Sequence, residues 1–301
     1  MPAYLENARI TDYSSSNGTV TITNSVVQSN SFNVPEGADF EALLGTSGTF
    51  VINSNNDIVD SFTANEQVVF GAVTDVKFDG STPVEIELNG EWYDLNNNYV
   101  PRFNGDTGES LVQGDRTVAE ERTADYAKFV VNSAGEVVFY DAYDWDDSIL
   151  VESVEDGIVY GYGQEEDASD YTIVQDGQTI SVDDLNRGDI LYYNVDAEYA
   201  EVYNNLVSGE VESVFEESVV VDGVEYEYNG ARYLAADGTI QNLDATLLEE
   251  FIDTDEPITL YLNREGHISY VIADFEGISV TGNGVFLNSE INAFAQGTRA
   301  L

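Results

Sequence analysis

Apolar and polar residues alternate along most of this chain, which is the pattern of β-strands that bury one face. The alternating runs are interrupted by Asn-Gly and Asp-Gly pairs. These pairs favour two-residue hairpin turns because their residues tolerate positive φ angles. The chain is therefore predicted to be mainly β and rich in hairpins. The clearest turns are predicted at Asn89–Gly90, Asp176–Gly177 and Asp222–Gly223.

A second kind of hairpin recurs along the sequence. In each copy an apolar strand reaches an asparagine, a short polar turn follows, and a second apolar strand begins. Self-similarity of this kind is the signature of a repeat architecture. It predicts four tandem small modules that resemble β-barrels or sandwiches, each with about five strands. The anchoring asparagines are Asn53, Asn132, Asn194 and Asn263.

The predicted modules differ in length because the loops between their hairpins differ. Short helices are expected in these connecting loops, most clearly at residues 243–251, where the apolar positions fit one helical face. The second module carries the largest insertion, near residues 98–126. The last stretch begins a fifth copy, and we interpret it as a partial module or as an assembly strand open to a neighbour. The predicted boundaries are 1–62, 71–143, 157–205, 209–274 and 277–301.

Two stretches carry a resemblance to a known family. They are residues 184–193, where an Asp-Leu and Gly-Asp turn leads into a strand, and residues 209–272. In this pattern the chain resembles the tandem β modules of bacterial surface-layer proteins. The resemblance implies a non-enzymatic structural protein. Such a protein self-assembles, or packs with partners, into an extracellular lattice, tube or fibre, and its assembly can depend on cations.

Other functions remain open at this stage. The first residues have neither the basic nor the apolar region of a secretory signal, and no cell-wall-anchoring helical triplet is recognisable. A structural component of a tailed-bacteriophage virion would explain both features, because lysis releases it without export. An adhesin or carbohydrate-binding module is a further alternative, with Trp92 and Trp145 as its candidate contacts. We expect an extracellular location, in a cell-surface array or in a virion.

The composition adds an extreme acidic charge to this picture. Asp and Glu number 57 against 10 Lys and Arg, which gives a formal net charge of −47. Such a surface repels phosphate and anionic lipid, so no nucleic-acid partner is expected. No apolar run approaches the roughly 20 residues that span a bilayer, so no membrane insertion is expected. The expected partners are copies of the chain or other assembly subunits, in a homo-oligomer or polymer.

Ca²⁺ is the cofactor that this composition favours, because hard cations bind several oxygen ligands. Screening by salt or by Ca²⁺ would also relieve the self-repulsion of so many acids. No acidic cluster has the spacing of an EF-hand loop, and a charged solvated loop is the simpler alternative for each cluster. The candidate ligands are Asp144, Asp146 and Asp147, together with Asp253, Asp255 and Glu256; a further cluster contains Glu165, Glu166, Asp167 and Asp170.

The sequence predicts no catalytic site. Cysteine is absent, which excludes thiol nucleophiles, and His267 is the only histidine. One histidine without cysteine cannot form a multi-histidine zinc site, and an exposed turn residue is the simpler interpretation of His267. A glycosidase needs a pair of carboxylates at a defined separation, but among 57 acids no pair stands out. The protein is therefore predicted not to be an enzyme.

Overall fold

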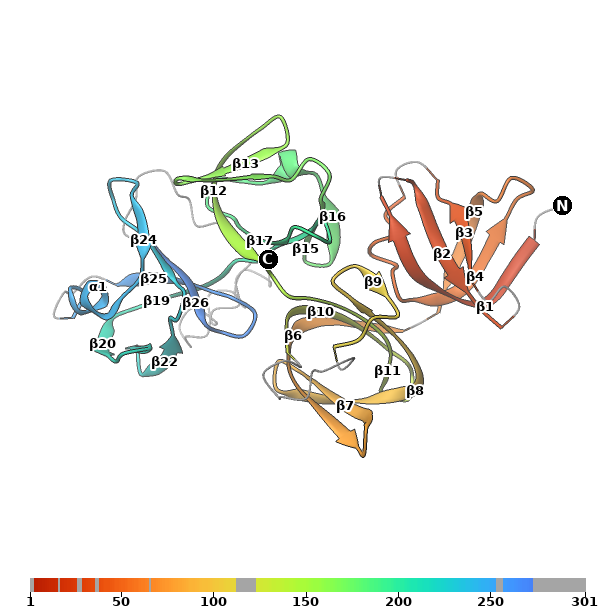
Figure 1. The fold of residues 1–301 in the computed structure, drawn as a ribbon, viewed down its shortest axis with the longest axis horizontal. Coiled ribbons are helices and arrows are strands. Elements are labelled where there is room, and N and C mark those ends of the chain that lie inside the picture. The colour runs from red at the N-terminus through yellow and green to blue at the C-terminus, as the bar shows by residue number, and fades with distance from the viewer. Residues whose placement is uncertain are drawn as a thin grey trace, which may run out of the picture. The chain divides into compact units, whose positions relative to one another are not determined.

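The computed structural model describes residues 3–15, 17–25, 29–35, 38–64, 66–111, 123–252 and 257–272. Within these residues the chain is mainly β, and its strands form five sheets (Figure 1). The chain divides into two compact units. The first unit comprises residues 1–147, 170–181 and 193–201, and the second comprises residues 148–169, 182–192 and 202–301.

The first strand group lies in the first unit and forms a sheet in the order β3-β2-β1-β4-β5. Its core contains Ile10, Ile22 and Phe50, which are fully buried. One parallel bridge, between Asn33 at the end of β3 and Asp57 just before β5, links the two edge strands. Pro35 follows soon after β3, and a residue without an N–H cannot extend the ladder. The strands are β1 (Ala3–Ser14), β2 (Thr19–Thr23), β3 (Asn30–Asn33), β4 (Ser47–Ile52) and β5 (Ile58–Thr63).

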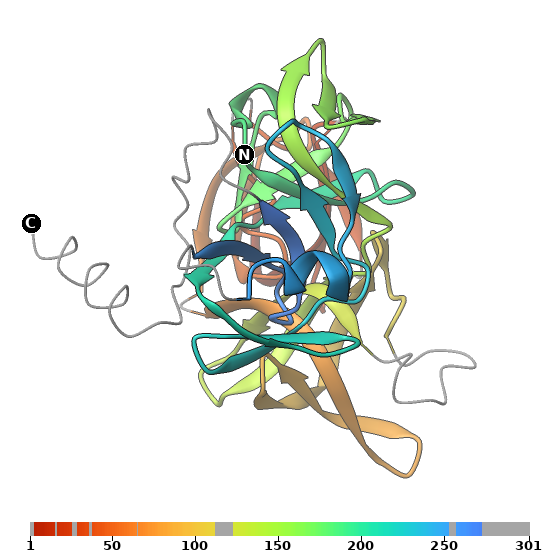
Figure 2. The ribbon, with the colours of Figure 1, turned by 90° about the vertical axis from the view of Figure 1, so that its left-hand side faces the viewer.

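The second strand group, also in the first unit, is a small closed barrel. Its order is β11-β10-β6-β7-β8-β9, and a parallel pairing of β11 with β8 closes the ring (Figure 1). Figure 2 shows the orange hairpin of this group from the side. That pairing runs from Glu136 opposite Asp94 to Ala142 opposite Phe103. The barrel is filled by buried apolar side chains such as Phe129. The strands are β6 (Gln67–Asp79), β7 (Thr82–Leu88), β8 (Glu91–Phe103), β9 (Asp106–Thr107), β10 (Ala124–Val131) and β11 (Glu136–Tyr143).

The third strand group contributes strands to both units. Its sheet has the order β14-β13-β12-β17-β18-β15-β16. A 3₁₀ turn at Val182–Asp184 lies between β16 and β17. The strands are β12 (Asp147–Glu155), β13 (Ile158–Gly161), β14 (Gln164–Asp167), β15 (Thr172–Gln175), β16 (Gln178–Ile180), β17 (Ile190–Asn194) and β18 (Tyr199–Val202).

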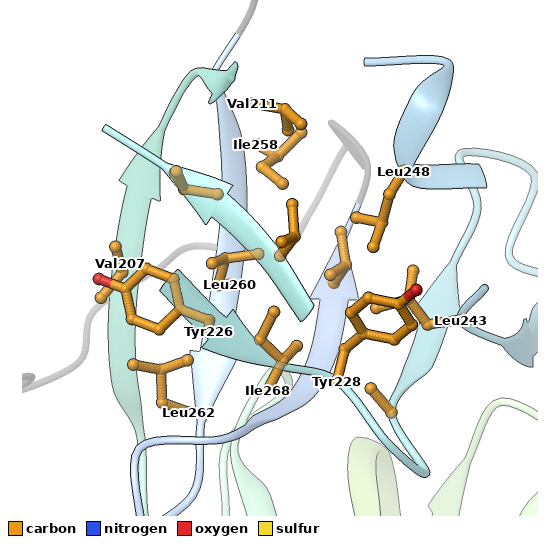
Figure 3. Close-up of a cluster of buried hydrophobic side chains, with 14 residues drawn as sticks. Val207, Val211, Tyr226, Tyr228, Leu243, Leu248, Ile258, Leu260, Leu262 and Ile268 are labelled. Carbon is orange, nitrogen blue, oxygen red and sulfur yellow. The ribbon is translucent and has the colours of Figure 1, made fainter. Parts of the chain in front are cut away.

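The fourth strand group lies in the second unit and has two sheets, β19-β25-β26-β23-β24 and β20-β21-β22. Helix α1 (Ala245–Glu249) begins after Asp244, whose carboxylate accepts the N–H of Leu247 at 2.9 Å. From α1, Leu248 points into the core (Figure 3). The strands are β19 (Asn205–Gly209), β20 (Val211–Val214), β21 (Ser218–Val221), β22 (Val224–Glu227), β23 (Arg232–Leu234), β24 (Ile240–Asn242), β25 (Ile258–Leu262) and β26 (Ile268–Ile272).

One pairing pattern recurs in the first two groups. In the first group, β1 pairs with β2 and β4, β2 pairs with β3, and β4 pairs with β5; in the second group, β6 pairs with β7 and β10, β7 pairs with β8, and β10 pairs with β11. The strands of the fourth group are divided between two sheets. A parallel pairing joins β8 to β11 in the second group and β23 to β26 in the fourth, and one parallel bridge lies at β3 and β5 in the first. In the closed barrel, this connectivity is that of a small Greek-key barrel.

The hairpins predicted at Asn-Gly and Asp-Gly pairs are present. They join β7 to β8, β15 to β16 and β21 to β22, and both turn residues of each pair have positive φ. The pair Asp156–Gly157 forms a further turn of this kind, between β12 and β13. Strand β12 therefore lies ahead of the module boundary predicted at residue 157. The predicted segment 277–301 and residues 112–122 of the predicted insertion lie outside the described residues.

Candidate functional site

A network of buried ionisable side chains is the candidate site, and it lies within the first unit. Lys128, one of only two lysines in the chain, is 3% exposed. Glu41, Arg102 and Asp141 are buried with it. Charged side chains are almost never fully buried unless they are paired. These four residues come from separate parts of the sequence, so the network shows how distant segments are held together.

The pair Arg102–Asp141 lies across the seam that closes the barrel. Arg102 on β8 and Asp141 on β11 are directly opposite each other in the parallel ladder. The Nη1 atom of Arg102 donates to both carboxylate oxygens of Asp141, at 2.9 and 3.0 Å, and also to the hydroxyl of Tyr143. The Tyr143 hydroxyl donates in turn to Asp141 at 3.3 Å. The ion pair therefore reinforces the backbone ladder of this seam.

Arg102 also extends the network to the first strand group. Its Nε atom lies 3.4 Å from a carboxylate oxygen of Asp12 on β1. Close by, the hydroxyl of Thr107 on β9 donates to the backbone carbonyl of Thr11 at 3.0 Å. The closed barrel and the first strand group are therefore joined through polar contacts to β1.

Lys128 makes the second connection between these two groups. Its Nζ atom donates to the backbone carbonyls of Glu41 and Ala42, at 2.7 and 3.1 Å. Both acceptors lie in the segment between β3 and β4, whereas Lys128 lies on β10. The carboxylate of Glu41 accepts a hydrogen bond at 3.2 Å from the hydroxyl of Tyr199 on β18. Segments that are far apart in the sequence are thus fixed around one buried lysine.

Burial and pairing shift the pKa values of these groups in opposite directions. Burial raises the pKa of the Glu41 carboxyl, and the charge of Lys128 opposes that rise. Burial likewise raises the pKa of Asp141 against the opposing charge of Arg102, and it lowers the pKa of Lys128. Burial acts to lower the pKa of Arg102, but the surrounding negative charges, led by Asp141, raise it well above its ordinary value. Each of these side chains therefore relies on an oppositely charged neighbour to favour its ionised form inside the protein.

Stacked aromatic rings border the network. The rings of Tyr143 and Tyr199 are nearly parallel, with centroids 4.1 Å apart, and Trp145 stacks on Tyr143 at 5.8 Å. Burial raises the pKa of both tyrosine hydroxyls well above the ordinary value, so both remain protonated hydrogen-bond donors. Trp145, a candidate sugar contact in the sequence, is part of this packing. The other candidate, Trp92, carries the ammonium group of Lys77 at 3.5 Å from its ring centroid.

A smaller polar cluster recurs at the start of two seams. Asp57 accepts hydrogen bonds from the side-chain amides of Asn33 and Asn53, each at 2.8 Å. In the closed barrel, Glu136 accepts from Asn96 at 2.8 Å and from Asn132 at 2.9 Å. These hydrogen bonds lower the pKa of Asp57 and of Glu136. We call each cluster of two asparagines and one acid a seam clamp.

The asparagines that anchor the predicted hairpins perform a common task. The side-chain carbonyl of Asn53 accepts the N–H groups of Asn55 and Asp57, and Asn132 and Asn263 accept equivalent turn N–H groups. Asn194 accepts the N–H of Ala197 at 2.8 Å. Asparagine is favoured at these positions because its short side chain closes the turn on its own backbone. The recurrence of asparagine in the sequence therefore has a structural cause.

The predicted calcium ligands have other contacts, or lie outside the described residues. The carboxylate of Asp146 accepts the N–H of Val195 at 2.8 Å, and the backbone of Asp144 bonds to Asn104. Asp147 begins β12. Among the described residues, no group of three or more histidine, aspartate or glutamate side chains is arranged to hold a metal ion. Calcium binding stays a prediction. The ligands that lie outside the described residues are Asp253, Asp255 and Glu256.

Sequence reasoning missed the buried network. A signal was nevertheless present, because Lys128 stands inside the apolar run 126–131 and Asp141 stands inside the apolar run 137–143. A single charge within a continuous apolar run marks a strand that is buried on both faces and needs a partner for that charge. Arg102 and Glu41 have no comparable pattern around them, so their part in the network follows from tertiary structure alone.

The chain matches no known protein family, and no curated protein sequence matches it. Among the residues that the structure describes, no helix has the length and apolar character needed to cross a membrane.

Proposed function

We propose that this protein is a non-enzymatic structural protein that assembles with copies of itself, or with other subunits, into an extracellular lattice, tube or fibre. In this proposal the chain consists of four tandem Greek-key modules with short helices in their connecting loops. The location is a cell-surface array of the surface-layer type. A tailed-bacteriophage virion remains the alternative setting for the same structural role.

The observation that carries the proposal is the way in which the buried charges connect distant segments of the chain. Arg102 pairs with Asp141, Lys128 donates to the backbone carbonyl of Glu41, and the carboxylate of Glu41 accepts from the hydroxyl of Tyr199. Buried ion pairs contribute little net stability compared with apolar packing, and their best-attested role is to specify one arrangement. A protein that bears load in an array benefits from modules held in a single orientation. The recurring strand pairing and the recurring seam clamps support the same interpretation.

The acidic surface is proposed to regulate assembly. With a formal net charge of −47, two copies repel each other at low ionic strength. Cations that screen or bridge the carboxylates then permit contact. Ca²⁺ is the proposed cation, because it binds several carboxylate oxygens at once. Asp144, Asp146 and Asp147 remain candidate ligands, together with Asp253, Asp255 and Glu256.

The proposal is tested by light scattering and negative-stain electron microscopy of the full chain, with and without millimolar Ca²⁺. Ordered arrays, tubes or fibres are expected, and they should form more readily with Ca²⁺. Mg²⁺ and NaCl at matched ionic strength separate specific binding from screening. A chain that stays monomeric in every condition would contradict the proposal.

One observation favours carbohydrate binding as a second candidate function. Trp92 lies on β8, the third strand of the closed barrel, and in OB-fold barrels the face formed by the second and third strands binds oligosaccharides. The ring of Trp92 is covered by Lys77, so a sugar would have to displace that side chain. Glycan-array binding that is lost in Trp92→Ala and kept in Tyr4→Ala would establish this second function.

A further inference from the structure

The first strand group keeps an open sheet edge along β5. On one side β5 pairs with β4. Beyond the bridge at Asp57, no other strand of the described chain pairs with its outer side. The N–H of Ser61 instead donates to the carboxylate of Asp60 at 2.9 Å. An edge strand of this kind is a template for pairing with a further strand.

Exposed apolar side chains lie on β5 and on the sheet face that continues from it to β1. Tyr4 is opposite Val51, and Val51 and Thr49 are opposite Asp60 and Phe62, so these residues share one face of the sheet. Tyr4 and Phe62 are 63% and 62% exposed, and Val59 on β5 is 54% exposed. Edge strands are usually protected by lysine, proline or inward-pointing charge. β5 has none of these and carries Asp60 as its one charged residue.

The C-terminal residues have the composition of a strand that could pair with this edge. Residues 277–301 lie outside the described residues, and their sequence contains the alternating run Ile278–Thr281, a Gly-Asn-Gly turn signal and the apolar run Val285–Leu287. Their charged residues are Glu290 and Arg299, which cancel. In a chain with a net charge of −47, this neutral segment can approach another copy without the repulsion that separates the acidic faces.

We propose that residues 277–287 of one copy add as a strand to β5 of a second copy. The proposal rests on the self-assembly proposed above and supplies its contact. Main-chain hydrogen bonds along β5 provide the affinity, and side chains at alternate positions of the added strand contact Phe62. Because the donor and acceptor are different parts of the chain, the contact is heterologous and builds an open fibre or a closed ring.

Disulfide trapping tests this pairing directly, because the chain contains no cysteine. Thr63→Cys on β5 is mixed with chains that carry a single cysteine at one of positions 278–281, under conditions in which the chain assembles. Adjacent positions sample both faces of the added strand. We expect one alternating pair of positions to form a heterodimer with Thr63→Cys on a non-reducing gel. Ser81→Cys, at an exposed turn of the closed barrel, is the matched control and should form none.

Two further variants block each side of the contact. A chain that ends at residue 276 lacks the donor strand, and Phe62→Lys places a charge on the acceptor face. Both should remain monomeric at concentrations at which the wild-type chain assembles. Mixing them should restore dimers only, since Phe62→Lys still donates its strand and the shortened chain still accepts it. Val224→Lys, at an exposed apolar residue of β22, should assemble normally.

The outcomes separate this inference from the proposed function. Normal assembly of the shortened chain, or equal trapping by Thr63→Cys and Ser81→Cys, would overturn the strand addition and leave self-assembly intact. A disulfide formed only within one chain, in the double variant Thr63→Cys/Ser279→Cys, would also overturn it. A wild-type chain that never assembles would overturn both proposals.

Discussion

The seams of the first two strand groups differ in how far their strands stay paired. In the closed barrel, β8 and β11 stay paired from the seam clamp at Glu136 as far as Ala142. Among the described residues of the first strand group, β3 and β5 are joined only at the clamp of Asp57. A seam clamp therefore lies at the start of both seams, but only in the closed barrel does strand pairing continue beyond it. Pairing of β8 with β11 closes the edge of the barrel, whereas β5 keeps an unpaired edge, at which we propose that a second copy adds a strand.

The physical causes of this difference are visible in the sequence around each third strand. Strand β8 continues for several residues past Asn96 and brings Arg102 opposite Asp141. Strand β3 ends at Asn33, and Pro35 follows almost at once. The open seam therefore lacks both the backbone ladder and the buried ion pair of the closed seam.

The largest expected effect comes from breaking the closed seam at its ion pair. Arg102→Met leaves Asp141 buried without its partner, which should lower the free energy of unfolding by roughly 3–5 kcal/mol. Urea unfolding followed by tryptophan fluorescence measures this loss in the first unit, because Trp92 and Trp145 both lie there. Lys77→Met removes an exposed ion pair of the same barrel and should cost only about 0–1 kcal/mol.

A double variant distinguishes a lost pair from lost packing. Arg102→Met combined with Asp141→Leu replaces the buried charges by apolar side chains and should recover most of the stability, because such replacements are often neutral. A double variant as unstable as the single one would show that the charges are needed in themselves.

The second prediction concerns the connection between the two groups. Lys128→Met removes the donor to two backbone carbonyls in the segment between β3 and β4. The Glu41 carbonyl keeps the N–H of Leu44 as a donor, so the cost comes mainly from losing hydrogen bonds to a charged group and should be roughly 1–3 kcal/mol. The loss should also loosen the first strand group, which hydrogen exchange of β4 amides would report as faster exchange. Unchanged exchange in β4 would mean that Lys128 stabilises the barrel alone.

The third prediction compares the seam clamps themselves. Asn33→Ala removes the side-chain contact across the open seam, whereas Asn96→Ala leaves the ladder between β8 and β11 in place. Asn33→Ala should therefore increase proteolytic cleavage between residues 53 and 66, and Asn96→Ala should leave cleavage near its own seam unchanged. Equal sensitivity of the two variants would contradict the difference between the seams.

The smallest expected effect is on titration. Hydrogen bonds from Asn132 and Asn96 hold the pKa of Glu136 below its ordinary value of 4.5. The clamp therefore contributes stability that is fully present above that ordinary value and is lost as pH falls through the lowered pKa. Asn132→Ala should raise the pKa of Glu136, which carboxyl carbon NMR measures directly. Asn53→Ala should raise the pKa of Asp57 in the same way.

The sequence was sufficient to predict the mainly β character, the hairpins at Asn-Gly and Asp-Gly turns, and the asparagines that close their turns. These features depend on alternation and on local turn chemistry, which are written in neighbouring residues. The predicted start of the third module was less informative. Gly157 resembles the glycines that open strands elsewhere, but here it forms a turn with Asp156 after β12.

The buried network and the open seam could not be predicted in the same way. Both depend on which strands meet across long sequence separations, such as Lys128 with Glu41 and Asn33 with Asp57. The acidic clusters illustrate the opposite problem. Asp144 and Asp146 attract attention by their spacing, yet the hydrogen bonds described for them close turns and connect strands. Within the buried network, only Lys128 and Asp141 stand singly inside apolar runs.

Hydrogen exchange of β5 and β11 amides, before and after assembly, tests the central claim most directly. In the monomer the outward-facing amides of β5 should exchange rapidly, and those of β11 that pair with β8 should be protected. On assembly β5 should become protected while β11 stays unchanged. Equal protection of both strands in the monomer, or exposed β5 amides in the assembled form, would contradict the account.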